Sequence, residues 1–211
     1  MKGRNPDRGG APRRRARLHG GVESGTNEHG PWPGGAQPEL TDGRLRVRPW
    51  RSEDASWLAA ACQDPEIQRW TTVPSPYTES DATRFVTDLA PNAWNQGRGW
   101  HAAVTDAATG DGLGAVGVVL VAGLDGVAEV GYYTAVHRRR RGVTSGAVGL
   151  VVEWVWSATG VDRLELHVDP RNRASAAVAL RCGFSLDGVL PGRGVHRGER
   201  HDVALYSLIR P

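Results

Sequence analysis

The stretch Ala135–Ala147 reads AVHRRRRGVTSGA and joins an expected strand, Val127–Thr134, to an expected helix, Val143–Ala158. The N–H groups in the first turn of a helix have no acceptor within the helix, and the helix dipole makes this end positive. Gly142 permits a close approach of the backbone to a ligand, and the arginines at positions 138–141 add positive potential. The stretch therefore predicts a site for a phosphate or pyrophosphate.

Other interpretations of the four arginines were weighed. Such a run is more common in a solvated surface loop or in an RNA-binding patch than in a cofactor site. The glycine and lysine spacing of a Walker A loop is absent, and so is the GxGxxG pattern of dinucleotide-binding folds. The position of the run, between a strand and a helix, favours a ligand site.

Three strands separated by turns rich in Asp and Gly are expected to form an antiparallel meander: Trp100–Thr105, Leu113–Val121 and Val127–Thr134. In the last of these strands Val130 and Tyr132 share one face, and Glu129 lies on the other.

The remaining elements flank this meander. Before it we expect a strand, a helix capped by Ser52, a short helical turn and a helix opened by Thr78: Leu45–Pro49, Ser52–Cys62, Asp64–Trp70 and Glu79–Leu89. After the long helix we expect a strand, a helix and two further strands: Arg163–Val168, Ala174–Arg181, Phe184–Leu186 and Val203–Ile209. This order mixes antiparallel strands with crossover helices and predicts an α+β, or mixed α/β, fold.

The charge of the chain is unevenly distributed. The 211 residues include 26 Lys and Arg and 23 Asp and Glu, a net charge of +3. Residues 1–40 carry all of this excess and contain nine glycines and five prolines. We expect 1–40 to be a disordered tail and 41–211 to be the folded domain. Since residues 41–211 have no net charge, the basic pI does not indicate nucleic acid as a partner.

Several classes of protein are excluded by composition. The longest apolar runs fall well short of the roughly 20 residues of a membrane helix, so no membrane partner is expected. Cys62 and Cys182 cannot frame a disulfide scaffold, and no Cys/His spacing is typical of a zinc site, so we expect no metal. No apolar segment follows Arg13–Arg17, as a signal peptide requires. A soluble cytoplasmic protein, monomeric or homodimeric, is expected.

The motifs also occur in a recognisable order. Arg139–Thr144 follows the pattern Arg or Gln, two variable residues, Gly, one variable residue and Gly or Ala, except that Thr144 stands at the last place. Asn172-Arg-Ala-Ser175 begins a helix, and Cys182-Gly-Phe184 leads into a strand. In this order the motifs resemble the GNAT (Gcn5-related) N-acetyltransferases, and within them the RimJ/RimL-like ribosomal-protein N-terminal acetyltransferases. The resemblance covers about residues 42–210.

This resemblance implies the GNAT acyl-CoA N-acyltransferase fold, a central mixed, mostly antiparallel sheet with helices on both faces. It also implies acetyl-CoA as the donor, lying where the family's fourth and fifth strands splay apart. The pantetheine arm is expected to pair with the backbone of Tyr133, Thr134, Ala135 and Val136. The pyrophosphate is expected to be held by the N–H groups of Arg139, Arg140, Arg141, Gly142, Val143, Thr144 and Ser145. Asn172 is expected to hydrogen-bond the cofactor from the next helix.

Direct attack of an amine on a thioester requires a neutral amine, a polarised carbonyl and a proton for the leaving thiolate. Glu129 is the candidate base, directly or through water, and its alternative is a strand-face carboxylate paired with an arginine. Ser175 is the candidate acid or hydrogen-bond donor to the thiolate, and its alternative is a cap or packing hydroxyl. Many relatives have a tyrosine four residues before the glycine of the Gly-Phe pair, where this chain has Ala179. This leaves Ser175 or Tyr133 to take that role.

Three further features concern the surroundings of the site. His101 opens a strand and either reaches the cleft or is structural. Gly192–Arg200, flanked by His196 and His201, is expected to be a loop that overhangs the acceptor site or simply connects two strands. Cys182 lacks a histidine-coupled nucleophile motif, so no covalent acyl-enzyme is expected.

We therefore expect an acetyl-CoA-dependent N-acetyltransferase that acts on a primary amine, either a protein N-terminus or a small amine. A non-catalytic acyl-CoA-binding sensor or interaction module on the same fold is the alternative, because the tyrosine is missing and Thr144 replaces a small residue. A third hypothesis is an RNA-binding role for Arg13–Arg17 and Arg138–Arg141.

Overall fold

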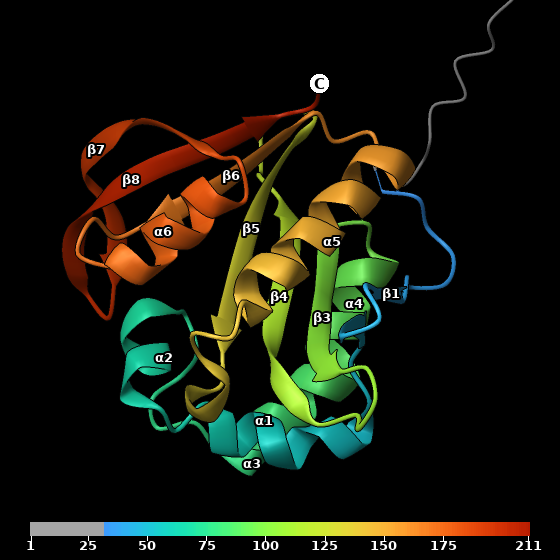
Figure 1. Ribbon diagram of the computed structural model, residues 1–211. Helices are drawn as coiled ribbons and strands as arrows, with labels where there is room; N and C mark the ends of the chain where they lie inside the picture. Colours follow the sequence, from blue (N-terminus) through green and yellow to red (C-terminus); the bar gives the residue numbers. More distant parts are fainter. Residues whose placement is uncertain (1–31) are drawn as a thin grey trace, which may run out of the picture.

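The computed structural model describes residues 32–211, and these residues form one mixed sheet of eight strands (Figure 1). The expectation of a disordered segment over 1–31 lies outside the described residues. The strands are β1 (Leu40–Thr41), β2 (Leu45–Pro49), β3 (Gly99–Asp106), β4 (Gly112–Leu120), β5 (Val127–Thr134), β6 (Arg163–Val168), β7 (Ser185–His196) and β8 (Glu199–Ile209). Their order is β1-β2-β3-β4-β5-β6-β8-β7, with every neighbouring pair antiparallel except β5 and β6. The expected mixed, mostly antiparallel sheet is confirmed.

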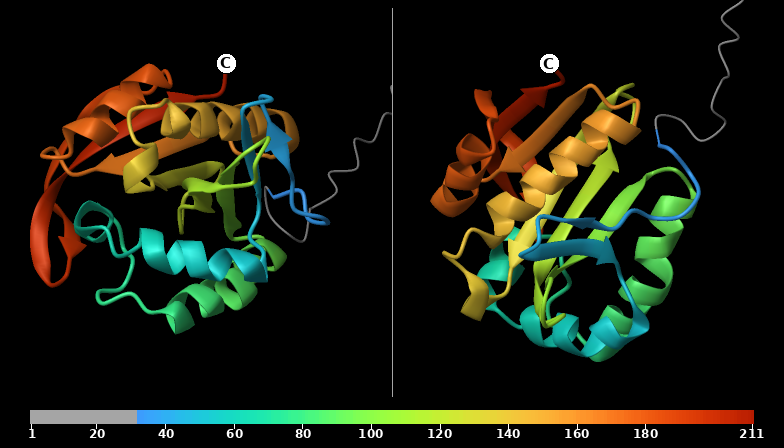
Figure 2. Two further views of the ribbon diagram at one scale, coloured as in Figure 1. Left: turned by 60° about the horizontal axis from the view of Figure 1, so that its bottom comes forward. Right: turned by 45° about the vertical axis from the view of Figure 1, so that its right-hand side comes forward.

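Helices cover both faces of this sheet, as expected. They are α1 (Ala55–Ala61), α2 (Pro65–Trp70), α3 (Glu79–Arg84), α4 (Ala90–Asn95), α5 (Val143–Ala158) and α6 (Arg173–Arg181). In the left view of Figure 2, α5 and α6 lie above the sheet, and α1, α3 and α4 lie below it. A turn of π-helix, Phe85–Leu89, joins α3 to α4, so the helix expected to end at Leu89 continues to Asn95.

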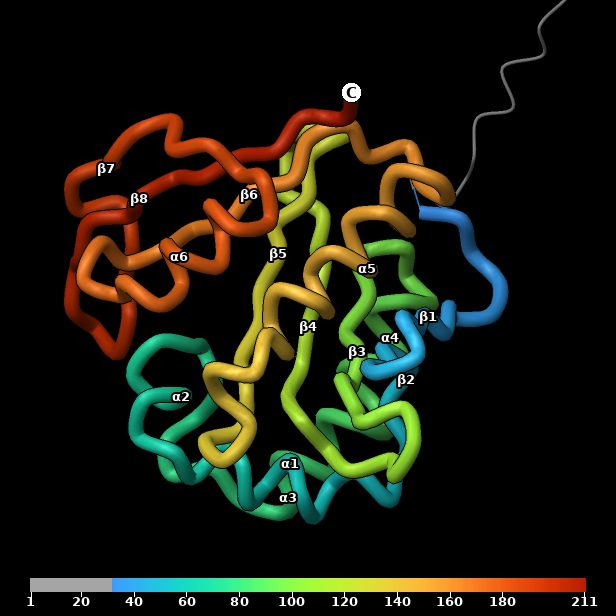
Figure 3. Tube along the Cα trace, in the orientation of Figure 1, coloured from blue at the N-terminus to red at the C-terminus, as the bar shows by residue number. Residues whose placement is uncertain are grey.

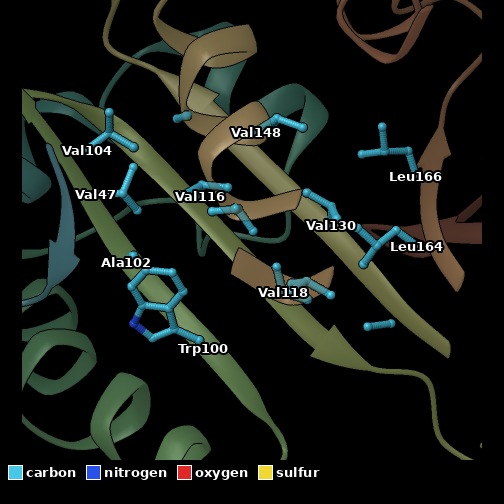
Figure 4. Packing of buried hydrophobic residues seen from close by; sticks show 14 of the residues in the cluster. Val47, Trp100, Ala102, Val104, Val116, Val118, Val130, Val148, Leu164 and Leu166 are labelled. Carbon is cyan, nitrogen blue, oxygen red and sulfur yellow. The ribbon is translucent and has the colours of Figure 1, made fainter. Parts of the chain in front are cut away.

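The main core lies between the sheet and α5. Figure 4 shows Val148 of α5 against Val116 of β4 and Val130 of β5, with Leu164 of β6 beside them. All four side chains are almost fully buried, and burial of a side chain of this size contributes roughly 1.5–3 kcal/mol. Because β-branched residues are stiff and fit a pleated surface, this valine-rich core holds α5 and the central strands in one fixed arrangement.

A second group of side chains fixes the start of α1. The helix was expected to begin at Ser52, but a 3-10 turn over Ser52–Asp54 precedes α1. The buried carboxylate of Asp54 accepts two hydrogen bonds from Arg48, at 2.7 and 2.8 Å, and one from the indole N–H of Trp57, at 2.9 Å. Asp54, rather than Ser52, therefore organises this helix start.

The folded unit begins earlier than the expected boundary at residue 41. Trp32 is fully buried, and its ring makes edge-on contacts with the rings of Trp94 and Trp154. Leu40 begins β1 and packs against the same core. The assignment of 32–40 to a disordered tail is therefore wrong, because one large aromatic side chain anchors this glycine- and proline-rich segment.

The strands β5 and β6 separate along their length. They pair only from Val127 to Glu129 on β5 and from Arg163 to Glu165 on β6. Figure 3 shows the two strands side by side near the C-terminus of the chain and apart further down. Within residues 32–211, no strand pairs with β5 on this side beyond Glu129. The gap opens between the fourth and fifth of the strands expected from the sequence, as the resemblance implied.

The last two strands form a long hairpin where the sequence indicated a loop. β7 and β8 pair from Ser185 and Ser207 out to His196 and Glu199, so most of the expected loop 192–200 is strand. The turn is made by Arg197 and Gly198, both with positive φ, a conformation that glycine adopts without strain. In the part of the chain that the structure describes, no helix is long and apolar enough to cross a membrane.

Candidate functional site

An open cleft of about 2160 Å³ lies where β5 and β6 diverge. Its walls are the second half of β5, the start of α5, the start of α6, helix α2 and the tip of the β7–β8 hairpin. Glu129, Tyr133, Asn172 and Ser175 all line it, and so do residues of the arginine-rich turn. The splayed strands thus bring together most of the residues expected to form the site.

The start of α5 presents unpaired backbone donors to this cleft. Gly142 is the N-cap and has φ +71°, a left-handed conformation that glycine adopts without strain. The first intrahelical bond at this end runs from the N–H of Gly146 to the carbonyl of Gly142. Among the described residues no acceptor contacts the N–H groups of residues 140–145. Since the helix dipole is positive at this end, these N–H groups form an anion site.

The four arginines of the turn have two different environments. Arg138 pairs with Asp111 at 3.0 Å, and Arg139 pairs with Asp64 at 2.6 Å. Arg140 and Arg141 are exposed, and within residues 32–211 neither guanidinium takes part in an ion pair. Of these four, Arg140 and Arg141 therefore have guanidinium groups free of an ion pair among the described residues, and Arg140 lines the cleft.

Arg139 ties the turn to the opposite wall of the cleft. Its Nη2 donates to Asp64, the N-cap of α2, and its Nε donates to the carbonyl of Thr134 at 3.2 Å. Burial alone would raise the pKa of Asp64, but the hydrogen bonds from Arg139 and from the N–H of Ile67 hold it below the ordinary value. The ionised Asp64 therefore joins α2 to the end of β5.

Thr144 occupies the place where the family pattern has Gly or Ala. Its hydroxyl forms a hydrogen bond with the hydroxyl of Thr134, near the end of β5. The larger side chain is thus accommodated by a partner on the neighbouring strand.

The first turn of α6 carries Asn172 and Ser175. The side-chain oxygen of Asn172 caps the helix by accepting from the N–H of Ser175 at 3.0 Å, which leaves its NH₂ group as a donor. The Ser175 hydroxyl lies 3.0 Å from the hydroxyl of Tyr132 on β5. Tyr132 was assigned to a strand face in the sequence but not to the site. The alternation of the strand places it on the face that α5 and α6 cover.

Tyr133, the tyrosine that the sequence offered as an acid, has its hydroxyl away from Ser175. This hydroxyl accepts from the thiol of Cys62 at 4.0 Å, on the side of the sheet that α1 covers. Burial raises the pKa of Tyr133 well above its ordinary value, and burial raises that of Cys62 to about 11. The Tyr133 hydroxyl is therefore paired with Cys62, and Tyr132 is the phenol that contacts Ser175.

Glu129 lies at the point where β5 and β6 part. Its side chain is 44% exposed, and its Oε2 lies 3.4 Å from Nδ1 of His167 on β6. The expected alternative, pairing with an arginine, is not found among the described residues. His167 was not assigned to the site from the sequence. In a strand of alternating polar and apolar residues, a histidine cannot be told from any other solvent-facing polar residue.

An aromatic floor extends from Glu129 along the face that α1 and α3 cover. Trp50, Phe85 and His101 line the cleft, with ring-centroid distances of 5.7 Å from Phe85 to each of the other two. Burial, followed by the charge of Arg98, lowers the pKa of His101, so this imidazole is neutral at physiological pH. His101 therefore reaches the cleft, which is one of the two alternatives that the sequence left open for it.

The tip of the β7–β8 hairpin closes one side of the cleft against α2. Arg197 Nη2 donates to the carbonyl of Gln68 at 3.0 Å, and His196 Nε2 lies 3.3 Å from the same oxygen. The segment expected to overhang the acceptor site thus contacts α2. In the described residues no group of three or more His, Cys, Asp or Glu side chains could hold a metal ion.

Comparisons with known proteins agree with this geometry. Residues 44–185 match the family model of the acetyltransferase (GNAT) domain. The uncharacterised N-acetyltransferase YoaA of Bacillus subtilis is 26% identical over 174 residues, which cover 82% of this chain and 98% of that protein.

Two solved structures share the fold. RimL, a ribosomal L7/L12 alpha-N-protein acetyltransferase in complex with coenzyme A, gives a TM-score of 0.73 at 18% identity, covering 82% of this chain and 98% of its own. The microcin self-immunity acetyltransferase MccE, in complex with acetyl-CoA and AMP, gives 0.72 at 19% identity, covering 80% and 93%.

Proposed function

The chain belongs to the acetyltransferase (GNAT) domain family, and we propose that its cleft transfers the acetyl group of acetyl-CoA to a primary amine by direct attack of that amine on the thioester. One observation carries the proposal. On the side of β6, β5 has no strand partner beyond Glu129 within residues 32–211, and the same strand leads to a helix start whose N–H groups have no acceptor there. A free strand edge beside an anion site suits a molecule that has an amide-containing arm and a pyrophosphate.

The residues present fit acetyl-CoA as the donor. The free edge of β5 and the segment after it, Tyr133–Val136, offer backbone groups to the amides of the pantetheine arm in the manner of an added strand. The N–H groups of residues 140–145 would bind the pyrophosphate, with Arg140 and Arg141 adding charge-assisted contacts. The N–H of Arg139, also expected in this role, donates to the carbonyl of Val136 at 3.5 Å. The NH₂ group of Asn172 would donate to the donor molecule from the opposite wall.

Glu129 and Ser175 would serve the two proton transfers of the reaction. Glu129 lines the cleft at the fork of the strands, where its carboxylate can take a proton from the incoming ammonium group, directly or through water. Burial raises the pKa of Tyr132 to about 12, so its hydroxyl keeps its proton at neutral pH. Tyr132 and Ser175 would then donate a proton to the departing thiolate as one hydrogen-bonded pair.

The acceptor that we propose is the α-amine of a protein N-terminus. Two observations support this choice over a strongly cationic small amine. Among the described residues, Glu129 is the one carboxylate beside the aromatic floor, so the floor has no acidic cluster for a polycation. The other acidic residues of the cleft lie on α2, after β6 and on β8: Glu66, Asp169, Glu199 and Asp202. RimL, which shares the fold, is by its name an alpha-N-protein acetyltransferase. We also propose that the protein acts in the cytoplasm, in keeping with its use of acetyl-CoA.

An amine panel tests the proposed acceptor. The purified protein and acetyl-CoA are mixed with peptides that have free N-termini, with the same peptides blocked by N-acetylation, and with polyamines and aminoglycosides, and release of the CoA thiol is followed. We expect release with some free N-termini and none with their blocked counterparts. Release of the CoA thiol with small amines alone would overturn the proposed acceptor but would still support acetyl transfer to an amine. Release with blocked peptides that contain lysine would point instead to a side-chain amine.

A further inference from the structure

A line of polar side chains in mutual contact crosses the sheet where β5 and β6 part. His167 Nδ1 lies 3.4 Å from Oε2 of Glu129, and His167 Nε2 lies 3.0 Å from Oε2 of Glu165. Beyond Glu165, Arg163 Nε donates to Oε1 of Glu165 at 2.7 Å, and Arg163 Nη2 donates to Asp187 at 2.6 Å. The imidazole is therefore held between two carboxylates, one on each strand.

Glu165 fixes the state of one imidazole nitrogen. Its side chain is buried, which alone would raise its pKa, but hydrogen bonds from Arg163 and His167 lower the pKa below the ordinary value. An ionised carboxylate only accepts hydrogen bonds, so His167 Nε2 carries a proton and donates it to Glu165. This assignment follows from the partners of the ring.

The other nitrogen, Nδ1, faces the cleft at Glu129. In the neutral imidazole Nδ1 carries a lone pair, and it points at the carboxylate of Glu129, which is also an acceptor. With the ring neutral, the Glu129–His167 pair can therefore take up one proton, between Nδ1 and the carboxylate. On the far side of His167, β8 places the uncharged Leu205 at the paired position, so the charged groups that face the ring are Glu129 and Glu165, with Arg163 behind Glu165.

We propose that His167 is a second catalytic base, which together with Glu129 receives the proton lost by the acceptor amine. The inference rests on the proposed function and deepens it. Both side chains line the cleft at the fork of the strands. Because Glu165 holds the ring in one tautomer and balances positive charge on it, the imidazolium form is stabilised once the proton arrives. This is the arrangement in which a buried carboxylate makes a histidine an effective base.

The proton balance of the step is complete. The acceptor ammonium group gives one proton to the Glu129–His167 pair and becomes a neutral amine. As the amine nitrogen forms its bond to the acetyl carbon, the bond from that carbon to sulfur breaks. The second nitrogen-bound proton passes to water as the amide forms, and the thiolate takes up a proton from the Tyr132–Ser175 pair, which regains one from water. The proton on the Glu129–His167 pair then passes to solvent. The net products are the acetylated amine, the CoA thiol and one proton released to solvent.

Substitution of His167 tests the proposal through the pH dependence of turnover. We would measure kcat with acetyl-CoA and one peptide that has a free N-terminus, from pH 5 to pH 9, for the wild type, His167→Gln, His167→Asn and Glu165→Gln. His137→Gln is the matched control, because His137 is exposed and does not line the cleft. Affinity for CoA is measured for every variant by calorimetry.

The proposal makes a specific expectation for each variant. Both His167 variants should lower kcat at pH 7 by about tenfold to a hundredfold, at the low end of what a general base contributes. The deficit should shrink toward pH 9, where more of the amine is already neutral. The acidic inflection of kcat should move to lower pH, because the carboxylate of Glu129 alone then accepts the proton. Glu165→Gln should lower kcat in the same direction, and CoA affinity should stay within about twofold throughout.

Three results would overturn the inference. Unchanged kcat in both His167 variants removes His167 from the reaction. A loss of kcat that is equal at every pH, with the acidic inflection unmoved, shows that the ring has only a structural role. If the wild type itself releases no thiol with any amine, the proposed function fails first, and the inference fails with it. This last outcome is recognised before any variant is compared.

Discussion

The hydroxyl of Tyr132 on β5 lies 3.0 Å from the hydroxyl of Ser175 on α6, so the two walls of the cleft meet through one pair of hydroxyl groups. Both residues line the cleft, and Tyr132 Oη also lies 3.2 Å from the carbonyl of Ser175. The resemblance implies a tyrosine at the position of Ala179. In the proposed reaction the pair would supply a phenol from the strand in place of that one from the helix.

Removing either hydroxyl of this pair should slow acetyl transfer. We expect Tyr132→Phe and Ser175→Ala each to lower kcat by about tenfold, and the double variant by about a hundredfold or more, as for loss of a general acid. Affinity for acetyl-CoA should change little, because α6 remains capped by Asn172. Thiol release under saturating substrates measures the effect, and a double variant with the wild-type kcat would exclude the pair as the proton donor.

The arginines of the turn should differ in their effect on CoA binding. Arg140→Ala and Arg141→Ala should each weaken CoA about three- to tenfold, as expected for exposed charged contacts with phosphate, and less at high salt. Arg138→Ala is the matched control, since its guanidinium pairs with Asp111. Calorimetry at two salt concentrations measures the difference. Equal losses at all three positions would show that only the overall charge of the turn matters.

Much of this region could be predicted from the sequence. The bounds of β5, α5 and β6 agree with the expected ones, because alternation, valine periodicity and Gly142 mark their ends. The gap between β5 and β6 followed from the resemblance alone. The pairing of side chains across that gap depends on how far two non-adjacent segments diverge, which local patterns do not determine. For this reason neither Tyr132 nor His167 was assigned to the site.

The buried ion pair before α1 should carry a large share of local stability. We expect Asp54→Ala to lower the free energy of unfolding by about 3–5 kcal/mol, because it leaves Arg48 buried without its partner. The exposed pair of Arg51 and Glu53 gives the control, and Glu53→Ala should cost less than about 1 kcal/mol. Denaturant titrations at pH 7 provide both values. A loss below 1 kcal/mol for Asp54→Ala would contradict this role.

The same pair predicts a dependence of stability on acid. Burial alone would raise the pKa of Asp54, but hydrogen bonds from Arg48, Trp57 and the N–H of Arg51 lower it below its value in the unfolded chain. The stabilisation is therefore fully present above the ordinary aspartate pKa and is lost as the pH falls through the lowered value. Asp54→Asn should be less acid-sensitive than the wild type.

The start of the folded unit can be located by truncation. Deletion of 1–31 should leave the melting temperature within a few degrees of the full chain, since Trp32 stays in the core. Deletion of 1–40 removes Trp32 and Leu40, and should destabilise the protein by about 3–5 kcal/mol, as for loss of a buried tryptophan. Scanning calorimetry compares the two. Equal melting temperatures would restore the boundary at residue 41 that the sequence favoured.

The two regions that the sequence misassigned share one physical cause. Residues 32–40 are rich in glycine and proline, and the hairpin tip around residues 192–198 is rich in glycine, residues that local patterns associate with loops. In both segments, contacts with residues distant in the sequence determine the structure. Trp32 finds two other tryptophan rings, and Gly194 lies beneath the ring of His201, where a Cβ atom would come within 2.3 Å of His201 Nε2.

The central claim is that this cleft transfers acetyl groups to an amine and does not merely bind acyl-CoA. Its most direct test follows CoA thiol and acetylated peptide together, with a peptide identified in the amine panel. The account predicts equal amounts of both products, and at least tenfold less of each with Glu129→Gln at unchanged acetyl-CoA affinity. Thermal stabilisation by acetyl-CoA without amine-dependent thiol release would contradict it and would assign the fold to a sensor.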